Sequence, residues 1–211
     1  IQDRVAVVYA EGNIVDGKGS DGSIGGDKYA KIIRNLRKDD KVKAIVIRVN
    51  SGGGSALASE IIWREIELAK EQGIKVVTSM GDVAASGGYY IALPADHILA
   101  HPTSVTGSVG VLFLRPDVAG LMDKIGIGVE VSKTGENKDM GSSFRQATDE
   151  EKRIIQNMID QLGARFLDRI EADSQDAQPS QAGQLRERSP SNLHPFQGSL
   201  RDHLTQMWDQ H

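Results

Sequence analysis

The sequence contains no cysteine among its 211 residues. This absence excludes a disulfide-stabilised scaffold, a thiol nucleophile and a cysteine-ligated metal site. The chain also lacks any apolar run that approaches the roughly 18 residues of a membrane-spanning helix. It has no excess of basic residues, since 25 Lys and Arg against 29 Asp and Glu give a net charge of −4. The basic residues are scattered, so we expect no nucleic-acid partner.

What the sequence does contain is an alternation of strand and helix patterns. Short apolar runs rich in β-branched residues predict strands at 5–9, 43–49, 75–80, 97–100 and 109–113. Apolar residues at helical spacing predict amphipathic helices over 27–37, 55–70 and 148–170. Thr148 and Glu151 form a capping box at the start of the last one. This order predicts an α/β fold with mostly parallel strands.

Two segments lack such patterns. Residues 12–26 are rich in Gly and Asp and are predicted to be a loop. Residues 172–211 are rich in Gln, Ser, Asp and Arg, hold three of the six prolines and show no sustained apolar period. We therefore predict one domain over 1–171 and an atypical, weakly ordered tail over 172–211.

The first candidate for chemistry is the Asn-Ser-Gly-Gly-Gly segment at 50–54, which directly follows a predicted strand. Consecutive glycines leave backbone N–H groups free to point at an anion, either the oxyanion of a tetrahedral intermediate or a phosphate. A flexible strand-to-helix turn is the alternative interpretation. No Lys-Ser/Thr pair follows the glycines, so a Walker-type nucleotide site is excluded.

The second candidate is Ser86, within Ala-Ala-Ser-Gly-Gly-Tyr-Tyr at 84–90. A serine on a strand-to-helix turn between small residues presents its hydroxyl to a substrate, with the Gly87 N–H and the helix N-terminus beside the reacting carbonyl. A helix N-cap is the simpler interpretation of the local sequence. The two glycines that follow favour the nucleophile, because a cap does not need them.

A serine nucleophile needs a base within hydrogen-bonding reach. Lys138 lies in a polar, Gly-bounded segment at 133–141, where an ordinary surface lysine is the alternative. To act as a base it must be desolvated, so that its pKa falls well below about 10.4. His101, before Pro102, is a second candidate, although a structural histidine at a strand edge would look the same.

Taken together, these segments resemble signal peptide peptidase A, of the Ser–Lys membrane peptidases that share the spiral fold of Clp protease and crotonase. The resemblance is carried by four blocks in order, at 46–55, 84–89, 106–111 and 138–145. It implies a spiral of ββα units over 1–171. It also implies that Ser86 is the nucleophile, Lys138 the base, and Gly87 with Gly53 or Gly54 the oxyanion donors. Ser108 would help to orient the lysine.

The resemblance further implies an endopeptidase that degrades cleaved signal peptides or similar membrane-derived peptides, with no metal or cofactor. It implies a homo-oligomer with sites shared between neighbouring subunits. We also expect a location at the extracytoplasmic face of a bacterial or archaeal membrane, through an anchor that this chain does not include.

The sequence departs from the family pattern at three places. Gly52 replaces a usual proline, which should loosen the turn. His101 replaces a usual asparagine, and because Clp proteases carry their catalytic histidine in a similar His-Pro context, His101 is kept as a less favoured base. The family's closing segments are not found after residue 170. Two other functions stay open: a crotonase-type acyl-CoA enzyme and a non-catalytic scaffold, although retention of both Ser86 and Lys138 argues against the scaffold.

Overall fold

The computed structural model describes residues 2–176. The chain divides into two compact units, which are described separately. The first comprises the chain up to Val109 together with the residues from Phe166 onward, and the second comprises Gly110–Arg165.

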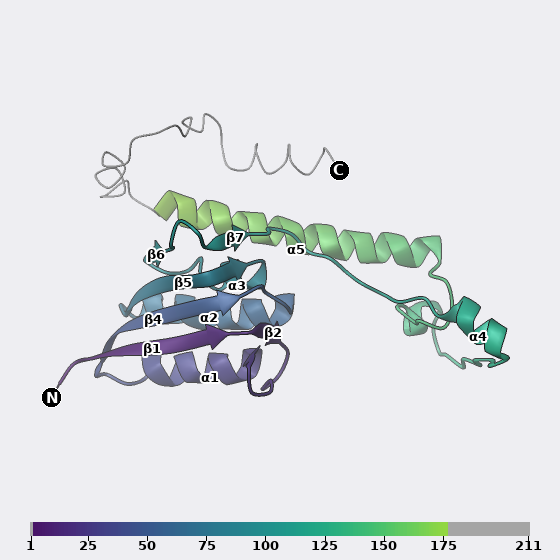
Figure 1. The fold of residues 1–211 in the computed structure, drawn as a ribbon, viewed down its shortest axis with the longest axis horizontal. Helices are drawn as coiled ribbons and strands as arrows, with labels where there is room; N and C mark the ends of the chain where they lie inside the picture. Colours follow the sequence, from purple (N-terminus) through teal and green to yellow (C-terminus); the bar gives the residue numbers. More distant parts are fainter. Residues whose placement is uncertain (1, 177–211) are drawn as a thin grey trace, which may run out of the picture. The chain divides into compact units, whose positions relative to one another are not determined.

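The first unit is built on a parallel β-sheet (Figure 1). Its strands follow the order β1-β4-β5-β6, and the short β7 pairs with the end of β5. Two further strands, β2 and β3, form a separate parallel pair. In the sequence they come between β1 and the first helix. The strands are β1 (Arg4–Glu11), β2 (Asn13–Val15), β3 (Ser23–Gly25), β4 (Val42–Ser51), β5 (Lys75–Ala85), β6 (His97–Leu99) and β7 (Val105–Gly107).

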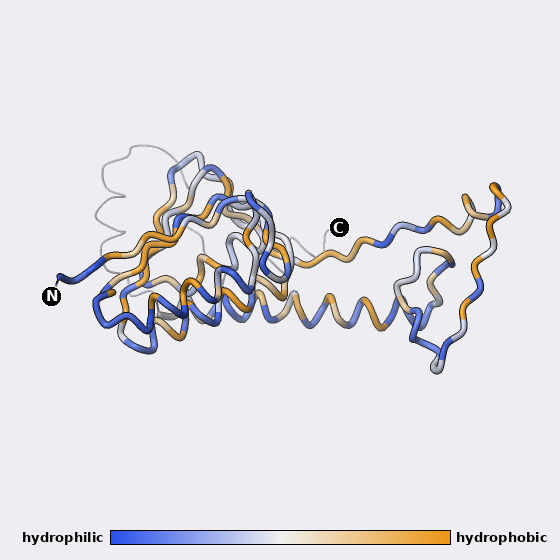
Figure 2. The backbone as a smooth tube through the Cα atoms, turned by 90° about the horizontal axis from the view of Figure 1, so that it is seen from below, coloured by the Kyte–Doolittle hydropathy of each residue, from blue (hydrophilic) through white to orange (hydrophobic). Residues whose placement is uncertain are grey.

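Helices α1 (Gly26–Arg37) and α2 (Ala56–Glu71) pack against one face of this sheet. Alternate residues of β4, including Ile45 and Ile47, are fully buried against Ile33 of α1 and Ile62 of α2. The strands are largely hydrophobic along their length, as the tube in Figure 2 shows. The residues that become buried are therefore those at the period-2 positions of the strands and the period-3.6 positions of the helices, as the sequence predicts.

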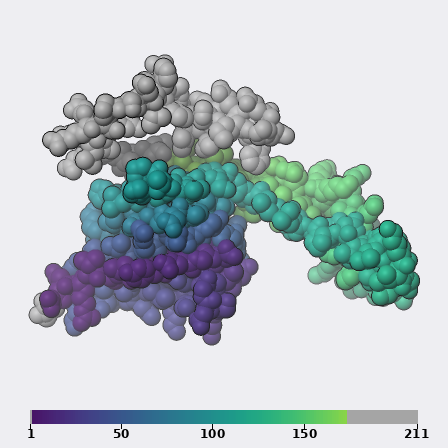
Figure 3. All heavy atoms as spheres, viewed as in Figure 1, coloured from purple at the N-terminus to yellow at the C-terminus, as the bar shows by residue number. Residues whose placement is uncertain are grey.

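Strand β1 forms one edge of the sheet and lies at the molecular surface, where its residues form a continuous band in Figure 3. Its side chains alternate between the core and the exterior. Val8 is buried, whereas Val7 and Tyr9 are more than half exposed.

A second cluster in the first unit surrounds α3 (Gly87–Tyr90). Trp63, Tyr90 and Phe166 form edge-to-face aromatic contacts, with Tyr90 and Phe166 centroids 4.9 Å apart. The Arg169 guanidinium lies 3.5 Å from the centroid of the Trp63 ring and 3.2 Å from a Glu60 carboxylate oxygen. The part of α5 (Asp149–Asp176) from Phe166 onward is thus fixed to α2 and α3.

The second unit contains α4 (Ala119–Ile125), the 3₁₀ turn η1 (Glu136–Asp139) and the start of α5. Gly126, in the left-handed conformation, ends α4, and the Val118 N–H donates to the Ser143 carbonyl over 2.8 Å. The segments before α4 and between α4 and η1 form no helix or strand, and they carry many exposed apolar side chains, among them Leu112, Leu114, Ile127, Val129 and Val131.

The predicted α/β class with mostly parallel strands is confirmed. Three local predictions were wrong. The predicted loop 12–26 contains the paired strands β2 and β3, residues 109–113 form no strand, and α5 continues to Asp176, into the predicted tail. The rest of that tail, from residue 177, lies outside the described residues. Within the described range, no helix is both long enough and apolar enough to cross a bilayer.

Candidate active site

Ser86 occupies a strained turn between β5 and α3. Its φ of 50° and ψ of −122° lie outside the regions that non-glycine residues normally adopt. The turn is held by hydrogen bonds from the Ser86 N–H to the Gly107 carbonyl, 2.8 Å, and from the Tyr90 N–H to the Ser86 carbonyl, 2.9 Å. The Ser86 side chain makes no capping hydrogen bond, so the N-cap interpretation is wrong. A serine on a strained strand-to-helix turn is typical of hydrolase nucleophiles.

The glycines after Ser86 are required by close packing. A Cβ on Gly87 would lie 2.5 Å from the Ser59 Oγ of α2, and a Cβ on Gly88 would lie 2.4 Å from the Ser51 carbonyl oxygen. Both distances are shorter than any normal contact. The Gly-Gly pair therefore allows α3 to approach α2 and the end of β4.

The glycine loop lies directly against this turn. A Cβ on Gly53, whose φ is +99°, would lie 2.6 Å from the Gly87 nitrogen and 2.8 Å from the Ser86 Cβ. The Gly53 N–H donates to Ser51 Oγ over 3.1 Å, so it is already engaged. No hydrogen bond within the described residues occupies the N–H groups of Gly54 or Gly87. Gly53 and Gly54 were the two loop residues predicted to donate to the oxyanion. Of these, Gly54 is therefore the one whose N–H remains free to do so.

Ser108 follows β7, whose last residue, Gly107, is paired with Ala85 in the sheet. This register brings the backbone of Ser108 to the level of Ser86. Ser108 is exposed and, with a φ of 52°, is the only other described non-glycine residue with positive φ. Two unusual backbone conformations thus lie on neighbouring strand ends, and such conformations concentrate at functional sites.

Lys138 lies in η1 of the second unit, and its side chain is exposed. Its N–H donates to the Gly135 carbonyl over 3.2 Å. Its ammonium makes no ion pair with any described residue. Because Ser86 and Lys138 belong to different units, their pairing stays a prediction.

His101 is engaged in a local turn. Its Nδ1 lies 2.8 Å from Thr103 Oγ1 and accepts a hydrogen bond from the Thr103 N–H over 3.3 Å. Since a backbone N–H can only donate, the proton of a neutral His101 is on Nε2. Neither ring nitrogen then offers a free lone pair, which weakens the case for His101 as a base.

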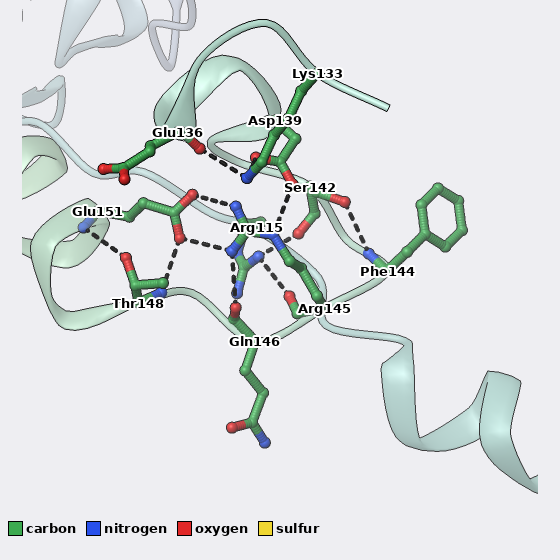
Figure 4. A network of polar contacts seen from close by, with 10 residues as sticks. All are labelled: Arg115, Lys133, Glu136, Asp139, Ser142, Phe144, Arg145, Gln146, Thr148 and Glu151. Atoms are coloured by element: carbon green, nitrogen blue, oxygen red, sulfur yellow. Dashed lines mark hydrogen bonds and ion pairs between the residues drawn. The ribbon is translucent and has the colours of Figure 1, made fainter. Parts of the chain in front are cut away.

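Sequence reasoning missed the charged network that surrounds the lysine turn, shown in Figure 4. Arg145 donates both to Asp139 and to Glu151, and Lys133 also donates to Asp139. Hydrogen bonds from Arg145 and Lys133 hold the pKa of Asp139 well below its ordinary value. Hydrogen bonds from Arg145 and the Thr148 backbone lower the pKa of Glu151 to about 2. The Thr148–Glu151 capping box was the one visible signal of this cluster, and it is confirmed.

Comparisons with known proteins identify the family of the chain. The model of peptidase family S49 matches residues 68–183, and the chain belongs to that family. It is 40% identical over 181 residues to Protease 4 of Salmonella typhi, covering 86% of this chain and 29% of that protein. It is 37% identical to the chloroplastic serine protease SPPA of Arabidopsis thaliana, covering 80% of this chain and 25% of that protein. The resemblance to the signal peptide peptidase A family is thereby confirmed.

Among solved structures, the chain is similar to a mutant of the 1510-N membrane-bound stomatin-specific protease in complex with a substrate peptide. The identity is 26% and the TM-score 0.43, over 55% of this chain and 49% of that one. The chain spans only about a quarter to a third of the length of the first relatives named above.

Proposed function

We propose that this chain carries the catalytic centre of a serine endopeptidase with a Ser–Lys dyad, Ser86 as nucleophile and Lys138 as general base. The observation that carries the proposal is the Ser86 turn, where a strained serine with no capping role lies against the Gly53–Gly54 loop. Membership of peptidase family S49 supports the same conclusion.

In this mechanism neutral Lys138 accepts the Ser86 hydroxyl proton as Oγ attacks the peptide carbonyl carbon. The free N–H groups of Gly54 and Gly87 stabilise the oxyanion of the tetrahedral intermediate. Collapse of the intermediate breaks the C–N bond, and Lys138 returns the proton to the departing amine. A water molecule, deprotonated by the same lysine, then releases the acyl group from Ser86.

The substrates we propose are cleaved signal peptides or similar peptides released from a membrane. This follows from the family resemblance together with the names of similar proteins, one of which, in Enterococcus faecium, is named as a signal peptide peptidase. We propose that the protein works as a homo-oligomer, with Ser86 and Lys138 contributed by neighbouring subunits, at the extracytoplasmic face of a cell membrane.

The test is reaction with a fluorophosphonate probe, which bonds covalently to an activated serine, together with hydrolysis of a fluorogenic peptide. Ser86→Ala should abolish labelling, and Lys138→Ala should lower peptide hydrolysis by about a thousandfold or more. Lys152→Ala is the matched control, because Lys152 is an exposed lysine of the same unit, paired with Asp149. Unchanged hydrolysis in the Lys138 variant would refute the dyad.

Mixing the two inactive variants tests the shared site. If the dyad forms between subunits, a mixture of Ser86→Ala and Lys138→Ala proteins regains part of the activity, because some interfaces combine an intact serine with an intact lysine. A mixture as inactive as its components would exclude sharing between subunits. Thermal stabilisation by an acyl-CoA ester, without labelling of Ser86, would instead favour the crotonase-type function.

A further inference from the structure

The turn that carries Lys138 is fixed at both ends by charged side chains (Figure 4). Asp139, the residue after Lys138, accepts hydrogen bonds from Lys133 Nζ on one carboxylate oxygen and from Arg145 Nε on the other, each over 2.8 Å. The same Lys133 ammonium donates to the carbonyl of Glu136, the first residue of the turn, over 2.8 Å. Lys138 therefore lies between two anchored positions.

Arg145 links this turn to the start of α5. Its two terminal nitrogens donate to the two oxygens of Glu151, over 2.7 and 2.5 Å, and one also donates to the Gln146 carbonyl. Glu151 is only 2% exposed and also accepts from the Thr148 N–H over 2.8 Å. A guanidinium that bridges two carboxylates in this way uses a fork geometry that lysine cannot reproduce.

The network also engages the carboxylate that follows Lys138 in the sequence. Asp139 is the carboxylate adjacent to it in sequence, and both of its oxygens are already bonded to cations. A free carboxylate close to an ammonium favours the charged form of the amine. A general base must be neutral to accept a proton, so an unoccupied Asp139 would oppose the role of Lys138.

We propose that Arg145 is a positioning residue for Lys138: it holds the η1 turn against the start of α5 and keeps the Asp139 carboxylate from pairing with the lysine ammonium. This rests on the proposed function, in which Lys138 is the base. Arg145 makes no contact with the reacting atoms in this role.

The sign of the expected effect follows from the charges around the turn. The charged side chains of this network are Arg115, Lys133, Asp139, Arg145 and Glu151. Arg115 is bonded to the carbonyls of Ser142 and Arg145, and Glu136 joins the network only through its backbone carbonyl. Arg145→Gln removes a positive charge and frees one oxygen of Asp139, so the pKa of Lys138 should rise. Asp139→Asn removes a negative charge, so the pKa of Lys138 should fall.

The experiment measures the Lys138 pKa directly in the full chain. Lysines are reductively methylated with ¹³C-formaldehyde, the Lys138 resonance is identified by its absence in Lys138→Ala, and its chemical shift is followed against pH. We expect a rise of about one pH unit in Arg145→Gln and a fall in Asp139→Asn. Arg145→Lys, which keeps the positive charge but not the fork that bridges both carboxylates, should restore only part of the original value. The rate of peptide hydrolysis should fall by about 10- to 100-fold in Arg145→Gln, because the base is displaced.

The matched control is Arg153→Gln, the same substitution at an exposed arginine of α5 that pairs only with Glu150 among the described residues. It should change neither the titration nor the rate. Titration curves that do not move, or that move in the same direction, in Arg145→Gln and Asp139→Asn would overturn the proposal. The titration does not require catalysis, so the role proposed for Arg145 can be refuted while the Ser86–Lys138 dyad remains supported. Conversely, a Lys138→Ala variant that still hydrolyses peptide would refute the dyad, whatever the titration shows.

Discussion

At the scale of single residues, the backbone of Ser86 is the most informative feature of the candidate site. A non-glycine residue in such a conformation costs about 1–3 kcal/mol and persists only where the surrounding structure enforces it. Here the enforcing contacts are the hydrogen bond that the Ser86 N–H donates to the Gly107 carbonyl of β7 and the one that the Ser86 carbonyl accepts from the Tyr90 N–H of α3. Backbone strain of this kind concentrates at functional sites, and a strained strand-to-helix turn is typical of a serine nucleophile.

Replacement of Ser86 by glycine should therefore stabilise the protein relative to replacement by alanine. Both variants lose the hydroxyl, but only glycine adopts positive φ without steric cost. We expect the free energy of unfolding of the Ser86→Gly variant to be higher than that of the Ser86→Ala variant by about 1 kcal/mol. This value already allows for the greater entropy of glycine in the unfolded chain, which reduces the difference. Urea denaturation of the two variants measures the difference. An alanine variant of equal or greater stability would show that the turn is not strained.

The residue types of the site could be predicted from sequence, whereas their geometry could not. Ser86 and Gly87 were recognisable because small residues surround a serine after a strand. The conformation that distinguishes nucleophile from cap depends on a bond to Gly107, 21 positions away in the chain. Likewise, the occupation of the Gly53 N–H by Ser51 depends on the folded loop.

At the scale of elements, α1 and α2 are joined by a buried carboxylate. Glu65 of α2 is 5% exposed and accepts hydrogen bonds from Arg34 and Arg37 of α1. Burial alone would raise the pKa of Glu65, but the bonds from the two arginines outweigh it, and the pKa is lowered. The carboxylate therefore joins the two helices through bonds to two residues of α1.

Loss of this carboxylate should be costly. Glu65→Gln should lower the free energy of unfolding by about 1–3 kcal/mol, because the charge-assisted bonds from both arginines are weakened in a buried position. The matched control is Glu71→Gln on the same helix, where the exposed pair with Arg64 contributes about 0–1 kcal/mol. Thermal or urea unfolding of both variants gives the comparison. Equal effects would mean that the buried network contributes no more than a surface pair.

Elements with a long, regular hydrophobic period were predicted well, and short ones were not. Strand β4 and helix α2 are long enough to show a clear apolar period, of 2 in the strand and about 3.6 in the helix, so both could be predicted. The apolar run 109–113 has the composition of a strand, but among the described residues no neighbouring strand pairs with it. Strands β2 and β3 were missed because each has only three residues, too few to show a period in the sequence, and β2 also bonds through Ile14 to the distant Gly53–Ser55 loop.

At the scale of the whole molecule, several carboxyl groups have a lower pKa in the folded chain than in the unfolded chain. Among the described residues, four carboxyl groups have lowered pKa values: Glu65, Asp139, Asp149 and Glu151. At Glu65 burial is the largest single influence and raises the pKa, but the bonds from two arginines together outweigh it. At the other three, hydrogen bonds from arginine or lysine side chains lower the pKa more than burial raises it. A folded state that binds fewer protons than the unfolded chain gains stability as pH rises. These groups therefore contribute stability at neutral pH that acid removes.

Glu151 makes the prediction specific. Its pKa falls from an ordinary 4.5 to about 2 in the folded chain. Its contribution is therefore fully present above pH 4.5 and is lost as pH falls toward 2. Glu151→Gln should flatten the dependence of the free energy of unfolding on pH across this window. Thr148→Ala, which removes a cap worth about 1 kcal/mol but no titrating group, should lower stability while keeping most of the slope. Urea unfolding at a series of pH values separates the two, and a Glu151→Gln curve parallel to the original would mean that the Arg145 network does not hold this carboxylate ionised in solution.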